Sequence, residues 1–219
     1  PPRCVLCGSR GQGPCLDLCA ACESSLAHAA PVCVAGACPL LRSFVPFAYQ
    51  HPADHLVHAL KYRGQLAVAR VLGELLGRHV ECAGLAAGVD VVVPVPLYPR
   101  RHAERGFNQS HEIARWTARR LRCRLDGSLV VRRRDTHPQV GLGGDERRRN
   151  LDGAFAAATG VRGLRIALVD DVFTTGATLL ELGRAVHDAG ARSVEAWCVG
   201  RASVPKQVDL AHPQEVRQG

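Results

Sequence analysis

Two adjacent carboxylates, Asp170 and Asp171, precede a short turn rich in hydroxyl groups, and this segment is the part of the chain best suited to chemistry. Four apolar residues, 166–169, come before them, as is typical of a strand buried on both faces. An amphipathic helix follows the turn. A strand, a Gly/Thr turn and a helix N-terminus form a phosphate site, because free backbone N–H groups and the helix dipole point at the anion. Ribose hydroxyls or a bound divalent cation would account for the acids beside it.

A simpler interpretation of the same segment is an ordinary strand–turn–helix with a capping Asp. A cap requires neither a second acid nor three threonines around one glycine, Gly176. We therefore predict a sugar-phosphate site, in which the acids and the turn bind the same ligand.

Ten cysteines are spread unevenly, with seven of them in the first 38 residues. No run of apolar residues is long enough to span a bilayer, and the first residues do not have the pattern of a signal peptide. We therefore expect a cytoplasmic protein without membrane insertion. Clustered cysteines in such a chain indicate metal ligands before disulfides. The pairs Cys4-x-x-Cys7 and Cys19-x-x-Cys22 can aim four thiolates at one zinc ion, in a closed site that serves folding or docking.

Three further cysteines near the N-terminus lack this spacing. Cys33 and Cys38 are either the remnant of a second metal site or small buried residues, and we favour the second; Cys15 stays unassigned. Residues 31–46 contain prolines and few charges, and we expect them to link the zinc module to the main domain.

The net charge of +8 is concentrated in the middle of the chain. Residues 94–165 carry 16 Arg and 7 acidic residues, an excess of +9, whereas the rest of the chain carries −1. A GC-rich genome would explain the use of 26 Arg against 2 Lys, but it would not explain the clustering. Such a block attracts phosphates, either of a small ligand or of nucleic acid.

A second strand–loop–helix unit carries part of this basic block. Residues 89–96 have the pattern of a buried strand, and Asn108 is suited to cap the helix that follows. Arg100, Arg101 and Arg105 lie between them. Loops at the carboxyl edge of a parallel sheet form its ligand crevice, so we expect these arginines to face the phosphate turn. That placement suits the pyrophosphate part of a ligand.

Residues 136–151 form a third distinctive segment, which is basic and rich in glycine. It is either a mobile lid that closes over an anionic substrate and excludes water, or a solvated charge run.

Residues 166–178 resemble the phosphoribosyl pyrophosphate (PRPP) motif of type I phosphoribosyltransferases. The whole chain resembles the ComF family, a branch of that fold with an N-terminal zinc finger. The resembling segments follow the family's order: Cys4-x-x-Cys7 with Cys19-x-x-Cys22, Lys61-Tyr62-Arg63-Gly64, Pro94-Val95-Pro96, Arg105-Gly106-Phe107-Asn108-Gln109, Gln139 with Leu142, Glu146-Arg147-Arg148 with Asn150, and 166–178. One departure is that only Cys33 and Cys38 stand where many members have two further C-x-x-C pairs.

The resemblance implies a site for each part of PRPP. The two acids would hold the ribose hydroxyls, directly or through Mg²⁺, and the turn would bind the 5′-phosphate. The PRPP-binding residues would be Asp170, Asp171, Val172, Phe173, Thr174, Thr175, Gly176, Ala177 and Thr178. The candidates for the pyrophosphate and its loops are Arg100, Arg101, Arg105, Asn108, Gln109, Gln139, Arg147 and Arg148.

Three functions fit these sequence features. The first is transfer of a phosphoribosyl group from PRPP with loss of pyrophosphate, although the sequence names neither a catalytic base nor an acceptor. The second is a catalytically silent adaptor that binds PRPP or single-stranded DNA, since the resemblance implies a role in DNA uptake and natural transformation; ten aromatic residues offer few stacking platforms. The third is docking of a DNA-uptake or repair protein on the zinc module.

The expected fold is α/β: a type I phosphoribosyltransferase fold with a mainly parallel sheet, helices on both faces and a small hood, plus an N-terminal zinc module. Residues 1–45 would form the module and linker, and residues 46–219 the phosphoribosyltransferase-like domain, with hood helices over 46–85 and the core over 89–200. Core strands are expected near residues 90–95, 128–133, 153–158, 165–169 and 193–199.

Overall fold

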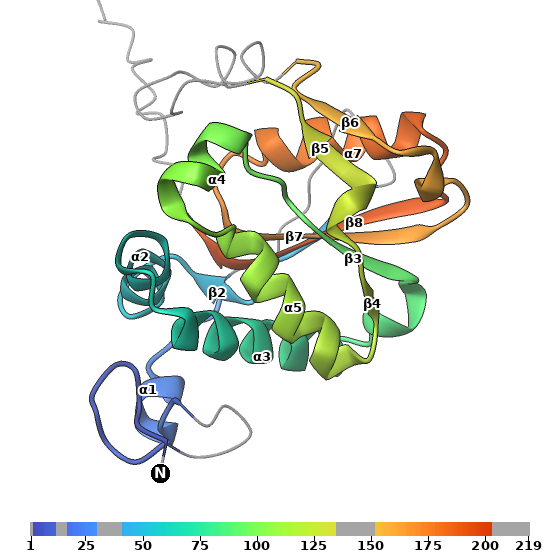
Figure 1. Ribbon diagram of the computed structural model, residues 1–219. Helices are drawn as coiled ribbons and strands as arrows, with labels where there is room; N and C mark the ends of the chain where they lie inside the picture. The colour runs from blue at the N-terminus through green and yellow to red at the C-terminus, as the bar shows by residue number, and fades with distance from the viewer. Residues whose placement is uncertain (1, 12–16, 30–40, 135–151, 203–219) are drawn as a thin grey trace, which may run out of the picture.

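The computed structural model describes residues 2–11, 17–29, 41–134 and 152–202, and a parallel sheet forms its centre (Figure 1). The strand order is β1-β8-β7-β3-β4, with β2 also paired to β8. A separate antiparallel pair, β5 and β6, lies outside this sheet. The strands are β1 (Leu41–Phe44), β2 (Phe47–Ala48), β3 (Val91–Pro94), β4 (Arg124–Leu125), β5 (Val130–Arg132), β6 (Phe155–Ala157), β7 (Arg165–Phe173) and β8 (Ser193–Arg201).

The sheet has an apolar core on each face, and the side-chain alternation of the strands divides residues between them. Ala167 and Val169 pack into the cluster that contains α2, α3 and α5, whereas Ile166 and Leu168 pack into the cluster that contains α7. All four residues are buried. The prediction of a strand buried on both faces is therefore confirmed, and the period of two explains the division.

Helices cover both faces of the sheet. Their bounds are α1 (Ala20–Ser24), α2 (Ala53–Arg63), α3 (Leu66–Cys82), α4 (Pro99–Arg105), α5 (Gln109–Leu121) and α7 (Ala177–Asp188). None of the helices in the described part of the chain has the length and apolar character needed to cross a membrane.

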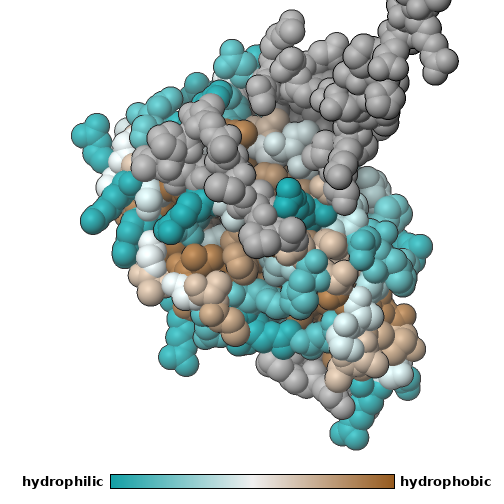
Figure 2. Space-filling view, turned by 180° about the vertical axis from the view of Figure 1, so that it is seen from behind, coloured by the Kyte–Doolittle hydropathy of each residue, from teal (hydrophilic) through white to brown (hydrophobic). Residues whose placement is uncertain are grey.

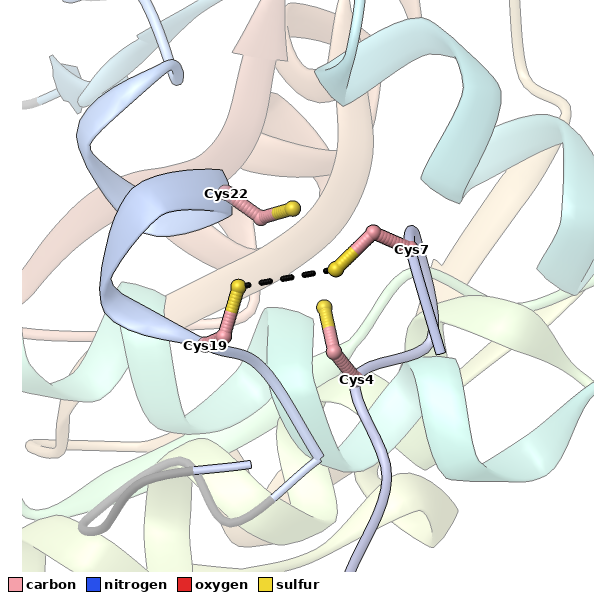
Figure 3. Close-up of side chains that lie close together, drawn as sticks. All are labelled: Cys4, Cys7, Cys19 and Cys22. Carbon is pink, nitrogen blue, oxygen red and sulfur yellow. Dashed lines mark hydrogen bonds between the residues drawn. The ribbon is translucent and has the colours of Figure 1, made fainter. Parts of the chain in front are cut away.

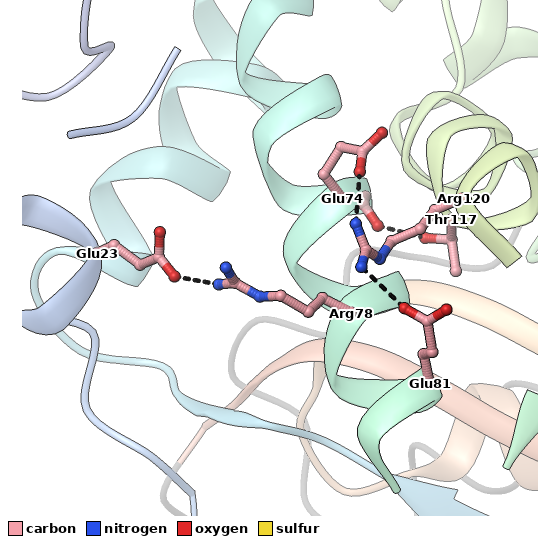
Figure 4. A network of polar contacts seen from close by, with 7 residues as sticks. Glu23, Glu74, Arg78, Glu81, Thr117 and Arg120 are labelled. Carbon is pink, nitrogen blue, oxygen red and sulfur yellow. Dashed lines mark hydrogen bonds and ion pairs between the residues drawn. The ribbon is translucent and has the colours of Figure 1, made fainter. Parts of the chain in front are cut away.

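Helices α3 and α5 pack closely because α3 has a glycine at the crossing. A Cβ atom on Gly73 would lie 2.5 Å from the Ile113 carbonyl oxygen. Thr117 of α5 donates a hydrogen bond to the Gly73 carbonyl at 3.1 Å, which ties the two helices together at the point of closest approach. Arg120 of α5 also pairs with Glu74 and Glu81 of α3 (Figure 4).

The N-terminal segment is fastened to α3 by ion pairs and apolar contacts. Asp17 pairs with Arg70, and Glu23 pairs with Arg78 (Figure 4). Leu18 and Leu26 are buried in the same core cluster as α3. Seen from behind, hydrophobic side chains also gather on the outer surface of this segment, at the lower right (Figure 2).

Two predicted strands pair differently from the expected core sheet, and two further observations concern the expected linker and hood. Strands near 128–133 and 153–158 exist as β5 and β6, but they pair antiparallel with each other, Val130 opposite Ala157 and Arg132 opposite Phe155, and not with the main sheet. The expected linker includes β1, whose register runs from Leu41 opposite Val194 to Phe44 opposite Trp197. Helix α3, expected in a hood, packs against α5 and β8.

Candidate functional site

A polar pocket of about 320 Å³ opens where β3 and β7 end at the same edge of the sheet. Parallel neighbours place their carboxyl ends together, and this is where open α/β sheets bind ligands. Its lining comes from segments far apart in the chain: Tyr49, Lys61, Val95, Pro96, Leu97, Arg101, Gln109, Ser110, Arg132, Asp170, Asp171, Val172, Thr174 and Thr178.

The acid pair lies inside β7, whereas the sequence pattern placed it just after the strand. Strand β7 continues to Phe173 because β8 pairs with it over the same length, Asp170 lying opposite Cys198 and Phe173 opposite Arg201. Asp170 accepts a hydrogen bond from the Ser110 hydroxyl at 2.7 Å and one from the Asp171 backbone N–H at 2.9 Å, both on Oδ1. These bonds fix the direction of the Asp170 carboxylate.

Lys61 of α2 reaches the second acid. Its Nζ lies 2.8 Å from Asp171 Oδ2, and the two side chains are only 22% and 5% exposed. Burial lowers the pKa of Lys61, but the Asp171 carboxylate outweighs it and the net pKa is raised. Burial, and then repulsion by Asp171, raise the pKa of Asp170 from its ordinary 3.8 to about 6. Two neighbouring carboxylates thus share one ammonium in a poorly solvated pocket.

Each carboxylate has one oxygen occupied by the protein. Ser110 donates a hydrogen bond to Oδ1 of Asp170, and Lys61 forms an ion pair with Oδ2 of Asp171. The second oxygen of each acid receives no hydrogen bond or ion pair from the described residues. Two acceptor oxygens side by side match a group with two neighbouring O–H donors, or an ion that prefers oxygen ligands.

The turn after β7 requires its glycine. Gly176 has φ = +75°, and a Cβ atom there would lie 2.7 Å from the Phe173 ring. Phe173 is buried beneath the turn, and α7 begins at Ala177. Thr174 and Thr178 line the pocket in front of the amino end of α7, whereas Thr175 is not among its lining residues. The predicted segment therefore divides into pocket residues and residues that shape the turn beneath them.

The predicted loop residues take different places. Arg101 lines the pocket, but Arg100 pairs with Glu104 at 2.9 Å on the helix surface and does not line it. Arg105 bonds to Gln109, which does line the pocket. Gln139, Arg147 and Arg148, and with them the segment 136–151, lie outside the described residues.

Asn108 positions the helix that faces the acids. Its Oδ1 accepts hydrogen bonds from the backbone N–H groups of Ser110 and His111 at 3.0 and 3.4 Å, which confirms the predicted N-cap of α5. Its Nδ2 donates to the Val95 carbonyl at 3.0 Å. Asn108 thus ties the start of α5 to the end of β3 and sets Ser110 against Asp170.

A second pocket adjoins the first and shares Lys61 and Arg101 with it. It measures about 520 Å³ and is lined by Lys61, Tyr62, Arg63, Gly64, Arg101, Glu104, Arg105 and Phe107. The two sequence segments 61–64 and 105–109, far apart in the chain, therefore meet beside the acid pair.

The four cysteines of the two C-x-x-C pairs converge on one point (Figure 3). Their sulfur atoms all lie within 4.8 Å of one another, and Cys7 Sγ is 3.6 Å from Cys19 Sγ. Hydrogen bonds from the Ser9 hydroxyl and backbone lower the pKa of Cys7 to about 6, whereas burial and the neighbouring cysteines raise the pKa of Cys22. Four thiolates at this spacing can hold one metal ion. Cys15, Cys33 and Cys38 lie outside the described residues.

Comparisons with known proteins agree with this architecture. A model of the phosphoribosyl transferase domain matches residues 108–218. The chain is 37% identical over 194 residues to the DNA utilization protein YhgH of Salmonella typhimurium, with 85% of each chain covered. It is 33% identical over 160 residues to competence protein F of Haemophilus influenzae, with 70% of each covered. The chain belongs to the ComF family.

Among solved structures, the ComF chain aligns with the allosteric regulatory enzyme of purine biosynthesis at a TM-score of 0.42 and 21% identity. The alignment covers 59% of this chain and 25% of the enzyme.

Four polar residues that line this ComF pocket were not predicted from the sequence as site residues: Tyr49, Lys61, Ser110 and Arg132. One signal pointed to Lys61. In a chain with 26 Arg and 2 Lys, a lysine marks a position where a compact charge on a flexible stem is required. Ser110, which is buried, carried no such signal, since its role depends on the cap at Asn108 and on the position of β7.

Proposed function

We propose that the chain binds PRPP together with Mg²⁺ in the first pocket. The observation that carries the proposal is the acid pair, in which one oxygen of Asp170 and one oxygen of Asp171 are left for the ligand. The 2′- and 3′-hydroxyls of ribose supply two neighbouring donors that match these oxygens. Mg²⁺ also fits the donor set, because it prefers carboxylate oxygens and keeps several of its waters.

The rest of the pocket suits the two phosphate ends of PRPP. The 5′-phosphate would lie on the turn 174–178, where Thr174 and Thr178 offer hydroxyls and the N–H groups of the first turn of α7 point outward. The pyrophosphate would lie against Arg101 and Lys61, at the junction of the two pockets. Val172 of β7 lines the pocket, and the remaining predicted residues, Phe173, Thr175, Gly176 and Ala177, would shape the turn.

The reaction that this pocket supports best is phosphoribosyl transfer. A lone pair of the acceptor forms the new bond to ribose C1, while the C1–O bond breaks and its electron pair leaves with pyrophosphate. The transition state is loose and cationic at the ribose, so positioning and charge stabilisation supply most of the rate. The nearby acid pair would stabilise that positive charge, and bound Mg²⁺ would neutralise the departing pyrophosphate.

Calorimetry with PRPP and Mg²⁺ tests the site, and pyrophosphate release tests turnover. We expect the wild type to bind and the double variant Asp170→Asn with Asp171→Asn to lose binding by about 100-fold or more, since two charge-assisted contacts are removed. Asp188→Asn, an exposed acid on α7, is the matched control. Binding without pyrophosphate release against any acceptor would indicate the silent adaptor instead.

A second candidate function is binding of single-stranded DNA on α5. Three guanidinium groups, those of Arg70, Arg115 and Arg119, lie 5.2–5.8 Å from the centroid of the half-buried Trp116 ring. Arginines around an aromatic ring suit phosphates and stacked bases. The names of the relatives, which refer to DNA utilization and competence, support a link to DNA uptake.

The two functions are separable by substitution. Arg119→Gln with Arg115→Gln should weaken oligonucleotide binding and reduce its salt dependence, because fewer phosphates are neutralised. The same variant should retain PRPP affinity. A salt-dependent affinity that is unchanged in this variant would exclude the Trp116 surface.

We also propose that the four-cysteine cluster holds structural zinc. In a tetrahedral site with Zn–S bonds of about 2.3 Å, sulfur atoms are about 3.8 Å apart, close to the 3.6 Å between Cys7 and Cys19. All four ligands come from the chain, so the ion would stabilise the segment and its contact with α3 rather than activate a substrate. Metal analysis of wild type and of Cys4→Ser tests this, with loss of about one zinc per chain expected in the variant.

A further inference from the structure

The second pocket is lined by arginines and aromatic rings. The lining includes three arginines, Arg63, Arg101 and Arg105, and a single acid, Glu104, whose carboxylate is paired with Arg100 at 2.9 Å. The pocket therefore carries a positive charge in addition to that of Lys61, which is shared with Asp171. A ligand in this pocket should be anionic.

Two aromatic side chains give the same pocket a flat apolar component. Tyr62 is 68% exposed, and its ring packs on the His58 ring one turn earlier, with 4.5 Å between the centroids. Phe107 enters from the other segment and lies beside Gly64. Pyrophosphate has no apolar surface that aromatic rings could contact, and it is far smaller than the pocket.

We propose that the second pocket is the acceptor site, and that the acceptor is a planar ring bearing a negative charge. This inference rests on the proposed binding of PRPP in the first pocket. Because the pockets share Lys61 and Arg101, an acceptor in the second pocket borders the ribose and pyrophosphate positions. Arg63 and Arg105 would bind the anionic group, and Tyr62 and Phe107 would contact the ring faces.

The transfer step needs only the acceptor and PRPP. A ring nitrogen gives its lone pair to ribose C1, the C1–O bond breaks, and pyrophosphate leaves with the bonding electrons. A nitrogen that carries a proton releases it to water.

Matched acceptor probes test the inference on the full chain. Orotate and uracil share a ring and differ by a carboxylate, as do nicotinate and nicotinamide. Calorimetry should show that the carboxylate member of at least one pair binds about tenfold or more tightly than its neutral partner, the effect of one charge-assisted contact. Arg63→Gln should abolish most of that preference, and Phe107→Ala should weaken both members of the pair.

Two controls separate this inference from the proposed function. Arg63 is exposed, so its substitution leaves the core intact, and PRPP calorimetry on each variant reports on the first pocket. Arg192→Gln changes an exposed arginine that directly precedes β8, at the amino edge of the sheet, and should leave probe binding unchanged. If PRPP binds but the probes do not, or the neutral members bind equally well, the acceptor assignment is wrong and the proposed function stands. If PRPP does not bind the wild type, both are wrong.

Discussion

Replacing Asp170 by Asn should stabilise the protein at neutral and alkaline pH while it removes a ligand contact. Burial and the Asp171 carboxylate raise the pKa of Asp170 from 3.8 to about 6. Between these values the folded state holds the proton more tightly than the unfolded state. Stability therefore falls as pH rises through this window, and the penalty is complete above about pH 6.

The size of the effect follows from the shift. About two pKa units correspond to about 3 kcal/mol, an upper bound on what removal of the charge can recover. Asn retains an Oδ1 that accepts from Ser110 and from the Asp171 N–H, but both bonds lose their charge assistance. We expect a net gain of about 1–2 kcal/mol at pH 8, a rise in Tm of about 3–6 °C for a chain of this size.

Urea unfolding followed by circular dichroism at pH 8, 6.5 and 5 measures the difference between wild type and Asp170→Asn. The gain should be nearly the same at pH 8 and pH 6.5, which both lie above the pKa of about 6, and clearly smaller at pH 5, where the wild-type carboxyl is mostly protonated in the folded state. Asp188→Asn should give no pH-dependent gain, since its side chain is 78% exposed. A variant that is less stable than wild type at pH 8, or a gain that does not vary with pH, would refute the electrostatic account of the acid pair.

Three further predictions concern the turn, the cap and the metal. Gly176→Ala should lower the free energy of unfolding in urea by about 1–3 kcal/mol, because the backbone there has φ = +75° and the new Cβ would lie 2.7 Å from the Phe173 ring. Adding Phe173→Leu should recover only the part of the loss that is due to the contact between the Cβ and the ring. Asn108→Ala should cost about 1–2 kcal/mol through loss of the α5 cap, whereas Asn108→Asp should cost less, since its carboxylate still accepts from Ser110 N–H. Chelation of zinc should raise amide hydrogen exchange in Ala20–Ser24 and leave α5 protected; equal protection with and without chelator would show that the segment folds without metal.

The sequence predicted those parts of the fold whose signals are local. The apolar run 166–169, the amphipathic helix after the turn and the cap at Asn108 all depend on neighbours in the chain, and the structure has each of them. The two C-x-x-C pairs likewise converge as their spacing required. Period, capping and turn chemistry are sufficient in such cases.

The remaining features depend on contacts distant in sequence. Charged residues usually end a buried strand, yet β7 continues through Asp170 because β8 pairs with it and Ser110 and Lys61 provide partners for the acids. Strand β1 exists because β8, about 150 residues later, offers an open edge. Lys61 lies in one of the segments that resemble the ComF family, but no local pattern connects it with Asp171, and only the fold brings the two side chains together. Tertiary pairing of this kind has no local signature.

Binding of PRPP to Asp170→Asn is the most direct test of the central claim, because this variant separates the site from the fold. Calorimetry with PRPP and Mg²⁺ at pH 8 should show binding to wild type and a loss of about 10- to 100-fold in the variant, which urea unfolding should show to be at least as stable. Equal PRPP affinity in the two proteins, or no binding to the wild type, would contradict the assignment of the acid pair to the ribose.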